Sequence, residues 1–183
     1  MKQLIFIIGV SVLFLSCGQK TNLSNAEAEA LIKKELNLPH DYDIKILSHT
    51  EKEDYFNRLQ QNGLISWKYK WDDNASHSFE CEIEVLDKGK PYFVDKSSKN
   101  NPYPNMDLYY FTFKGYTTEL NSIDGISMNN EDKTATVRYT LKVINISPFA
   151  EALENTEFVQ HSLKSPIKGE MVFKKFDTGW QIK

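Results

Sequence analysis

Alternation of apolar and polar side chains over residues 135–143 is the feature that most constrains the fold of this chain. Ala, Val, Tyr, Leu and Val occupy the odd-numbered positions, and Thr, Arg, Thr and Lys lie between them. A period of two residues is typical of a β-strand that buries one face and exposes the other. Residues 65–71 and 79–86 largely follow the same pattern, which predicts two strands joined by a polar turn.

Two capping-box sequences predict where helices begin in the N-terminal half. Residues 24–27 and 50–53 each place a hydroxyl side chain three positions before a Glu, so that each side chain can satisfy a backbone N–H group of the other residue. We therefore expect helices over residues 25–36 and 51–62, with a short strand over residues 42–47 between them.

The C-terminal half is expected to be mainly antiparallel β-structure. We predict strands over 106–114, 123–128, 135–143, 170–176 and 180–182, and a short helix over 148–153 that begins with a proline. The fold class is therefore α+β, with N-terminal helices and a β-hairpin followed by an antiparallel β-rich part.

Residues 96–105 are the predicted linker between two lobes. The segment is polar, contains two prolines and has no apolar period. It divides the chain into a helical and hairpin lobe over residues 24–95 and a β-rich lobe over residues 106–183. Small domains bury a smaller fraction of their surface, so we expect the two lobes to pack together through their aromatic faces.

The N-terminus predicts export. Lys2 precedes a nearly uninterrupted apolar run over residues 4–15, and Ser16 provides a small residue before Cys17. This order describes a secretory signal peptide over residues 1–16. The apolar run is shorter than the roughly 20 residues that a transmembrane helix needs.

Ser16 and Cys17 resemble the end of the signal peptide of bacterial lipoproteins. The resemblance implies that Cys17 is lipidated and becomes the first mature residue, and that residues 17–23 form a tether. Two acyl chains hold a protein on a membrane durably. Gly18 follows in place of an acidic retention residue, so the resemblance implies the cell envelope and, within it, the outer membrane.

The charge balance argues against binding to nucleic acid. The chain has 22 basic and 25 acidic residues and a formal net charge of −3. Proteins that bind nucleic acid or anionic membranes through charge need clustered Lys and Arg side chains. We therefore expect membrane attachment to depend on the lipid at Cys17.

Two parts of the chain resemble known folds. The second predicted helix, the hairpin and residues 92–94 resemble the second half of a winged-helix module. The C-terminal strand, Asp-x-Gly turn and Gly-Trp strand are similar to the ends of nuclear-transport-factor-2-like and cystatin-like folds. Glu51, Glu53 and Asp54 begin the second helix and would repel phosphate, so a role in DNA binding is not implied.

The sequence contains no recognisable catalytic or metal-binding motif. Phosphate-loop, dinucleotide-loop and nucleophile-elbow sequences are missing, and the four His residues are not spaced as zinc ligands. We predict no catalytic residue, metal or cofactor, although a triad assembled through space stays open. Cys81 lies on the apolar face of its predicted strand, which favours a small core residue over a reactive thiol.

Aromatic side chains are the remaining candidates for a binding site. Trp67, Tyr69 and Trp71 share one strand face, and Tyr103 lies in the predicted linker. Core packing is the alternative role for this face. The stripe of Glu80, Glu82 and Glu84 is interpreted as a solvated outer face, with a cation stripe as the alternative.

These observations predict an envelope lipoprotein that is a non-enzymatic binding or structural module. A protein or a glycan of the envelope is the expected partner. The alternative is a periplasmic enzyme or a small-molecule-binding protein with a pocket in the C-terminal β lobe, because cone-shaped α+β folds of the kind named above often open such pockets.

Overall fold

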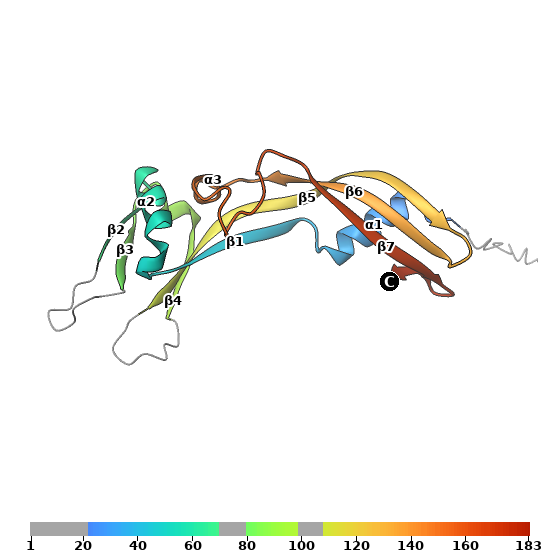
Figure 1. Ribbon diagram of the computed structural model, residues 1–183, viewed down its shortest axis with the longest axis horizontal. Helices are drawn as coiled ribbons and strands as arrows, with labels where there is room; N and C mark the ends of the chain where they lie inside the picture. The colour runs from blue at the N-terminus through green and yellow to red at the C-terminus, as the bar shows by residue number, and fades with distance from the viewer. Residues whose placement is uncertain (1–21, 70–79, 99–107) are drawn as a thin grey trace, which may run out of the picture.

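The computed structural model describes residues 22–69, 80–98 and 108–183. These residues form an elongated body with a long curved sheet running along it (Figure 1). The predicted signal peptide, Cys17, Trp71 and Tyr103 lie outside the described residues, as does most of the predicted linker.

The described residues have the predicted α+β character. The helices are α1 (Asn25–Glu35), α2 (Glu53–Gln61) and α3 (Pro148–Ala152), with short 3-10 turns at η1 (Thr50–Lys52) and η2 (Lys90–Tyr92). The strands are β1 (His40–Leu47), β2 (Ile65–Tyr69), β3 (Cys81–Val85), β4 (Phe93–Ser98), β5 (Tyr109–Asn129), β6 (Thr134–Ile144), β7 (Ile167–Phe176) and β8 (Gly179–Ile182).

The pairs formed by the described strands are all antiparallel. The main sheet has the order β1-β5-β6-β7-β8, with β4 also paired to β5, and β2 and β3 form a separate hairpin. The alternation over residues 135–143 is confirmed as β6, in which Ala135, Val137 and Tyr139 are buried and Arg138 is exposed. The predicted hairpin of β2 and β3 is also confirmed.

Strand β5 joins the two ends of the body. We expected separate strands over residues 106–114 and 123–128, but β5 is one continuous strand of 21 residues. Its first half pairs with β1 and β4, and its second half pairs with β6. Register shifts at residues 120–122 and 123–125 leave extra residues in β5, and such bulges bend a strand without ending it.

The predicted linker begins inside the sheet. Lys96, Ser97 and Ser98 belong to β4 and pair with Phe111, Tyr110 and Tyr109 of β5. These polar residues have no apolar period because β4 is largely exposed and, among the described residues, pairs with β5 alone. The expectation that residue 96 starts a connecting segment is therefore wrong.

Two hydrophobic clusters stabilise the body, and neither follows the predicted division at residues 96–105. The first packs α2, α3 and the hairpin on β1 and the first half of β5. In the second, Ala28 and Ile32 of α1 are fully buried with Val137 and Phe173 of the C-terminal strands. The first helix of the predicted N-terminal lobe thus belongs to the core of the C-terminal sheet.

The first of the two predicted capping boxes forms, and α2 begins later than the second one predicts. Ser24 Oγ accepts a hydrogen bond from the backbone N–H of Glu27 at 3.3 Å, and Glu27 accepts one from the backbone N–H of Ser24 at 3.0 Å. At the second position Thr50 opens a 3-10 turn, and α2 begins only at Glu53. The Glu53 carboxylate instead accepts a hydrogen bond of 2.6 Å from the Tyr69 hydroxyl.

Candidate functional site

The two aromatic candidates that the structure describes lie side by side on β2. The ring centroids of Trp67 and Tyr69 are 5.2 Å apart in an edge-to-face arrangement. Trp67 also packs 5.5 Å from the ring of Phe56 in α2, and its indole N–H donates to Asn57 Oδ1 at 3.1 Å. This aromatic face therefore packs the hairpin onto α2, as its core-packing interpretation predicts, while Trp67 stays partly exposed.

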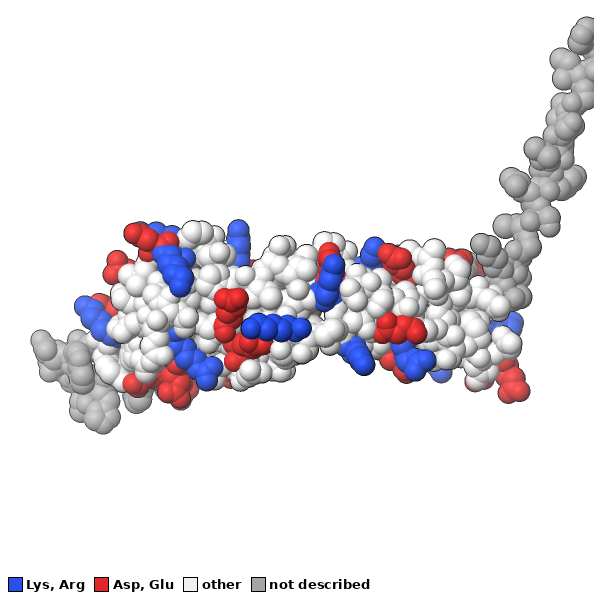
Figure 2. Space-filling view, turned by 90° about the horizontal axis from the view of Figure 1, so that it is seen from above, with Lys and Arg blue, Asp and Glu red and all other residues white. Residues whose placement is uncertain are grey.

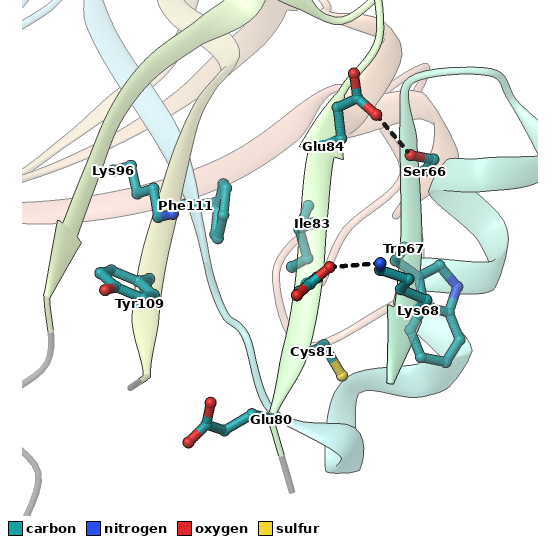
Figure 3. A pocket seen from close by; sticks show the side chains of 11 residues that line it. Ser66, Trp67, Lys68, Glu80, Cys81, Ile83, Glu84, Lys96, Tyr109 and Phe111 are labelled. Atoms are coloured by element: carbon teal, nitrogen blue, oxygen red, sulfur yellow. Dashed lines mark hydrogen bonds and ion pairs between the residues drawn. The ribbon is translucent and has the colours of Figure 1, made fainter. Parts of the chain in front are cut away.

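A groove of about 700 Å³ runs between the hairpin and the first half of the main sheet (Figure 3). One wall consists of hairpin residues and the other of residues from β4 and β5. Its lining residues are Ser66, Trp67, Lys68, Glu80, Cys81, Glu82, Ile83, Glu84, Lys96, Tyr109 and Phe111. We name this feature the hairpin groove.

The hairpin wall carries the predicted carboxylate stripe. Lys68 Nζ lies 2.8 Å from Glu82 Oε2, and Ser66 Oγ donates to Glu84 at 3.4 Å. Glu82 and Glu84 are exposed, in agreement with a solvated face, whereas Glu80 is only 7% exposed. Glu80 is buried because its backbone bridges to His49, which follows β1 and draws this end of β3 against the main sheet.

The opposite wall combines a cation with two aromatic rings. Lys96 Nζ lies 4.1 Å from the ring centroid of Tyr109 and 5.3 Å from that of Phe111. Figure 3 shows the Lys96 side chain extending from β4 toward β5, the strand that carries Tyr109 and Phe111. The ammonium group is attracted to the faces of the rings, so this wall offers an aromatic surface with a positive charge above it.

Sequence reasoning missed Lys96 and Phe111 as groove residues. Lys96 lies in a polar run whose sequence resembles a linker, and only its pairing with β5 places it opposite the hairpin. Phe111 belongs to an aromatic run that predicts burial, and it is indeed only 4% exposed.

The groove as a whole holds three carboxylates and two ammonium groups, so its charge is mixed with a small negative excess.

Cys81 is one of the lining residues of the groove, but its thiol is buried, as predicted. It is 7% exposed, and burial, assisted by the charge of Glu53, raises its pKa to about 11. A thiol that stays protonated near neutral pH is a poor nucleophile. Because the folded-state pKa lies above the ordinary value of 9.0, its stabilising contribution is complete below pH 9 and is lost as the pH rises toward 11.

The Cys81→Ser variant is expected to lower the free energy of unfolding by about 1–3 kcal/mol, because a hydroxyl group is costly to bury in an apolar site. Urea unfolding followed by circular dichroism measures this effect. In the native wild-type protein, Cys81 should react slowly with a thiol reagent at pH 8. A Ser66→Cys variant supplies a groove-facing thiol as the fast control. Equal labelling rates at both positions would contradict the burial of Cys81.

A smaller hollow of about 490 Å³ lies on the C-terminal sheet, where the alternative prediction expected a pocket. Asp124 accepts hydrogen bonds from Ser122 Oγ at 2.6 Å and Thr140 Oγ1 at 2.5 Å, and these bonds lower its pKa. Arg138 and Lys168 lie beside it. A carboxylate held ionised in this way is poorly matched to proton transfer near neutral pH.

The described histidines lie in separate places. His49 follows β1 and accepts a hydrogen bond from the backbone N–H of Glu51 at 3.2 Å, while His161 packs edge-on against Tyr116. Within residues 22–69, 80–98 and 108–183, no three His, Cys, Asp or Glu side chains gather closely enough to hold a metal ion. None of the helices in these ranges is both long enough and apolar enough to cross a membrane.

Comparisons with known proteins found no relative of this chain. Scans of protein-family models, of curated proteins and of solved structures each found no match to this chain. The function of the candidate site must therefore be argued from its geometry alone. The site is an aromatic groove of mixed charge at the start of β5, between the hairpin and β4.

Proposed function

We propose that this protein is a lipid-anchored, non-enzymatic module of the cell envelope that binds a polypeptide partner in the hairpin groove. The observation that carries the proposal is the position of the groove. It contains Tyr109, the first residue of β5. Asn22, the first described residue after Cys17, lies beside Met128, near the last residue of β5. Asn22 and the groove thus lie near opposite ends of one long strand.

The size and lining of the groove support a binding role. A volume of about 700 Å³ is within the range of ligand sites in proteins. The partly exposed rings of Trp67 and Tyr109 provide contact area, and charges of both signs can fix the orientation of a partner. The groove chemistry favours binding over nucleophilic catalysis. Glu53, the carboxylate near Cys81, already accepts a hydrogen bond from the Tyr69 hydroxyl. The buried Cys81 thiol stays protonated near neutral pH.

Strand β4 favours a polypeptide over other partners. Within the described parts of the chain, β4 pairs with β5 alone, and its outer edge is left open. Phe93 and Val94 on this strand are 37% and 48% exposed. An open edge offers backbone donors and acceptors to an extended segment. The edge adjoins the groove through Lys96, so one polypeptide could contact both features.

The anchoring part of the proposal rests on Cys17 and on the charge distribution. Positive and negative side chains are interspersed along the face seen in Figure 2, with no large basic patch there. The net charge of −3 agrees with this pattern. A body of this kind has little electrostatic attraction for anionic lipid, and covalent acyl chains would supply its affinity for the membrane.

Photocrosslinking in intact cells tests the proposed function. A photoreactive amino acid at Lys96 should give one discrete polypeptide adduct, because that side chain faces the groove. The same probe at Asp54, which is exposed on α2 at the same end of the body, is the matched control and should give none. Glu84→Lys should abolish the Lys96 adduct by reversing a groove charge, and Cys17→Ala should move the protein out of the membrane fraction.

Three results would contradict the proposal in different ways. Equal adducts from Lys96 and Asp54 would show that the groove does not select a partner. A glycan in the Lys96 adduct would exclude a polypeptide but keep a binding role. Unchanged membrane fractionation of Cys17→Ala would exclude lipid anchoring at that residue.

A further inference from the structure

The end of the body opposite the hairpin groove has its own surface hollow, of about 460 Å³. Its lining comes from the first described residue, the β5–β6 turn and the β7–β8 hairpin. The residues are Asn22, Met128, Asn130, Lys133, Lys175, Phe176, Asp177 and Trp180. We name this region the basal end.

Aromatic and basic side chains are paired at the basal end. Phe176 is 45% exposed, and Lys174 Nζ lies 5.9 Å from its ring centroid. Lys175 Nζ lies at the same distance from the ring of Trp180, which is partly exposed. Trp and other amphipathic side chains are enriched at the level of lipid headgroups, where Lys side chains reach toward phosphate.

Charges of both signs balance at the basal end. Lys133 and Lys175 are opposed by Asp177 in the hollow, and Lys174 adds a third positive charge beside Phe176. Glu131 and Asp132 lie on the adjoining turn, where Asp132 accepts a hydrogen bond from Asn129. Three Lys side chains thus accompany three carboxylates, so net charge does not draw this end to an anionic membrane. The rings of Phe176 and Trp180 are the groups that would contact a bilayer to which the body is already attached.

The length of the chain before the body brings the basal end close to any anchor at Cys17. Five peptide units separate Cys17 from Asn22, so their Cα atoms can be at most about 18 Å apart. Leu23 is 5% exposed and packs in the second hydrophobic cluster. Releasing more chain from the body would therefore expose buried apolar surface, which keeps the tether short.

We propose that the basal end docks on the lipid headgroups of the membrane, so that the body stands on the bilayer and presents the hairpin groove outward. This inference rests on the proposed lipidation of Cys17. Tyr109 and Met128 are separated by 19 residues of β5, which corresponds to about 60 Å of strand. An upright body would hold the groove at a distance of that order from the bilayer.

Spin labels on the full lipoprotein test this orientation. The protein is reconstituted in vesicles of phosphatidylethanolamine and phosphatidylglycerol, and the label is attached at Thr178→Cys in the β7–β8 turn or at Asp54→Cys in α2. Both positions are exposed, and the buried Cys81 serves as the unlabelled background. We expect collisions with a water-soluble nickel chelate to be several-fold fewer at position 178 than at position 54.

A pair of Phe variants identifies the contact. Phe176→Ser should restore nickel access at position 178, whereas Phe93→Ser, which alters an exposed Phe near the groove, should leave it unchanged. Equal access at positions 178 and 54 in protein that floats with the vesicles would overturn basal docking while lipidation stands. Protein that fails to float would overturn lipidation, and with it both basal docking and the anchoring part of the proposed function; groove binding is tested separately by the Lys96 crosslink.

Discussion

Phe149→Ala is expected to lower the free energy of unfolding by about 3–5 kcal/mol, the usual range for deleting a buried aromatic side chain. Phe149 is fully buried, and its ring stacks on Phe113 with centroids 4.0 Å apart and an interplanar angle of 15°. It also lies against Gly89, which follows β3 in the chain. The variant would leave a cavity where α3, β5 and the hairpin meet.

Phe93→Ala is the matched control for this cavity. Phe93 contacts the same Phe113 ring, with centroids 5.9 Å apart, but is 37% exposed. Its loss should cost about 1 kcal/mol or less, because little buried volume is vacated. Urea unfolding followed by circular dichroism measures both variants. Similar losses for the two would show that Phe149 is not a central contact of the first hydrophobic cluster.

Gly115→Ala is the second variant with a large expected effect, a loss of about 2–3 kcal/mol from overpacking. A Cβ atom at this position would lie 2.5 Å from the backbone oxygen of Tyr42 and 3.3 Å from Ile44 Cγ1. The pairing of β1 with β5 shifts register between Tyr42 and Asp43, beside this glycine. Backbone cannot move aside as a long side chain can, so the β1–β5 pairing should be strained.

Gly125→Ala on the same strand separates crowding from the general effect of replacing glycine. The nearest atom to its added Cβ would be Nη2 of Arg138 at 3.3 Å, which belongs to a long side chain that can shift. The expected change is within about 1 kcal/mol of zero. Thermal or urea unfolding of both variants provides the comparison. An equal effect at positions 115 and 125 would contradict the steric explanation.

The candidate site could be predicted only in part from the sequence. Alternation placed Trp67 and Tyr69 on one face of a strand, and it placed Cys81 on the buried face of the partner strand; β2 and β3 confirm both predictions. Lys96 was not predicted because its neighbours are polar and carry no period. Its position opposite the hairpin results from pairing with β5, a contact between the first residue of the predicted linker and a strand that follows the linker.

The two capping sequences show why similar local signals can have different outcomes. Ser24 and Glu27 hydrogen-bond each other's backbone N–H groups and form the box. At the second box, the side chain of Glu53 is taken by the Tyr69 hydroxyl from β2, and the preceding Lys52 pairs with Glu157 at 2.6 Å. These tertiary contacts move the start of α2, and nothing within residues 50–53 foretells them.

The amino-acid sequence by itself determined the elements whose signals are local: the alternation that makes β6, the cap that begins α1 and the proline that opens α3. Local chemistry is sufficient there because each signal acts within a few residues of the structure that it produces. Only the tertiary structure decided that β5 continues as one strand, that α1 belongs to the C-terminal core and that the hairpin groove forms. Those features depend on contacts between segments that are far apart in the sequence. Such contacts produce no periodic pattern of apolar residues from which they could be predicted.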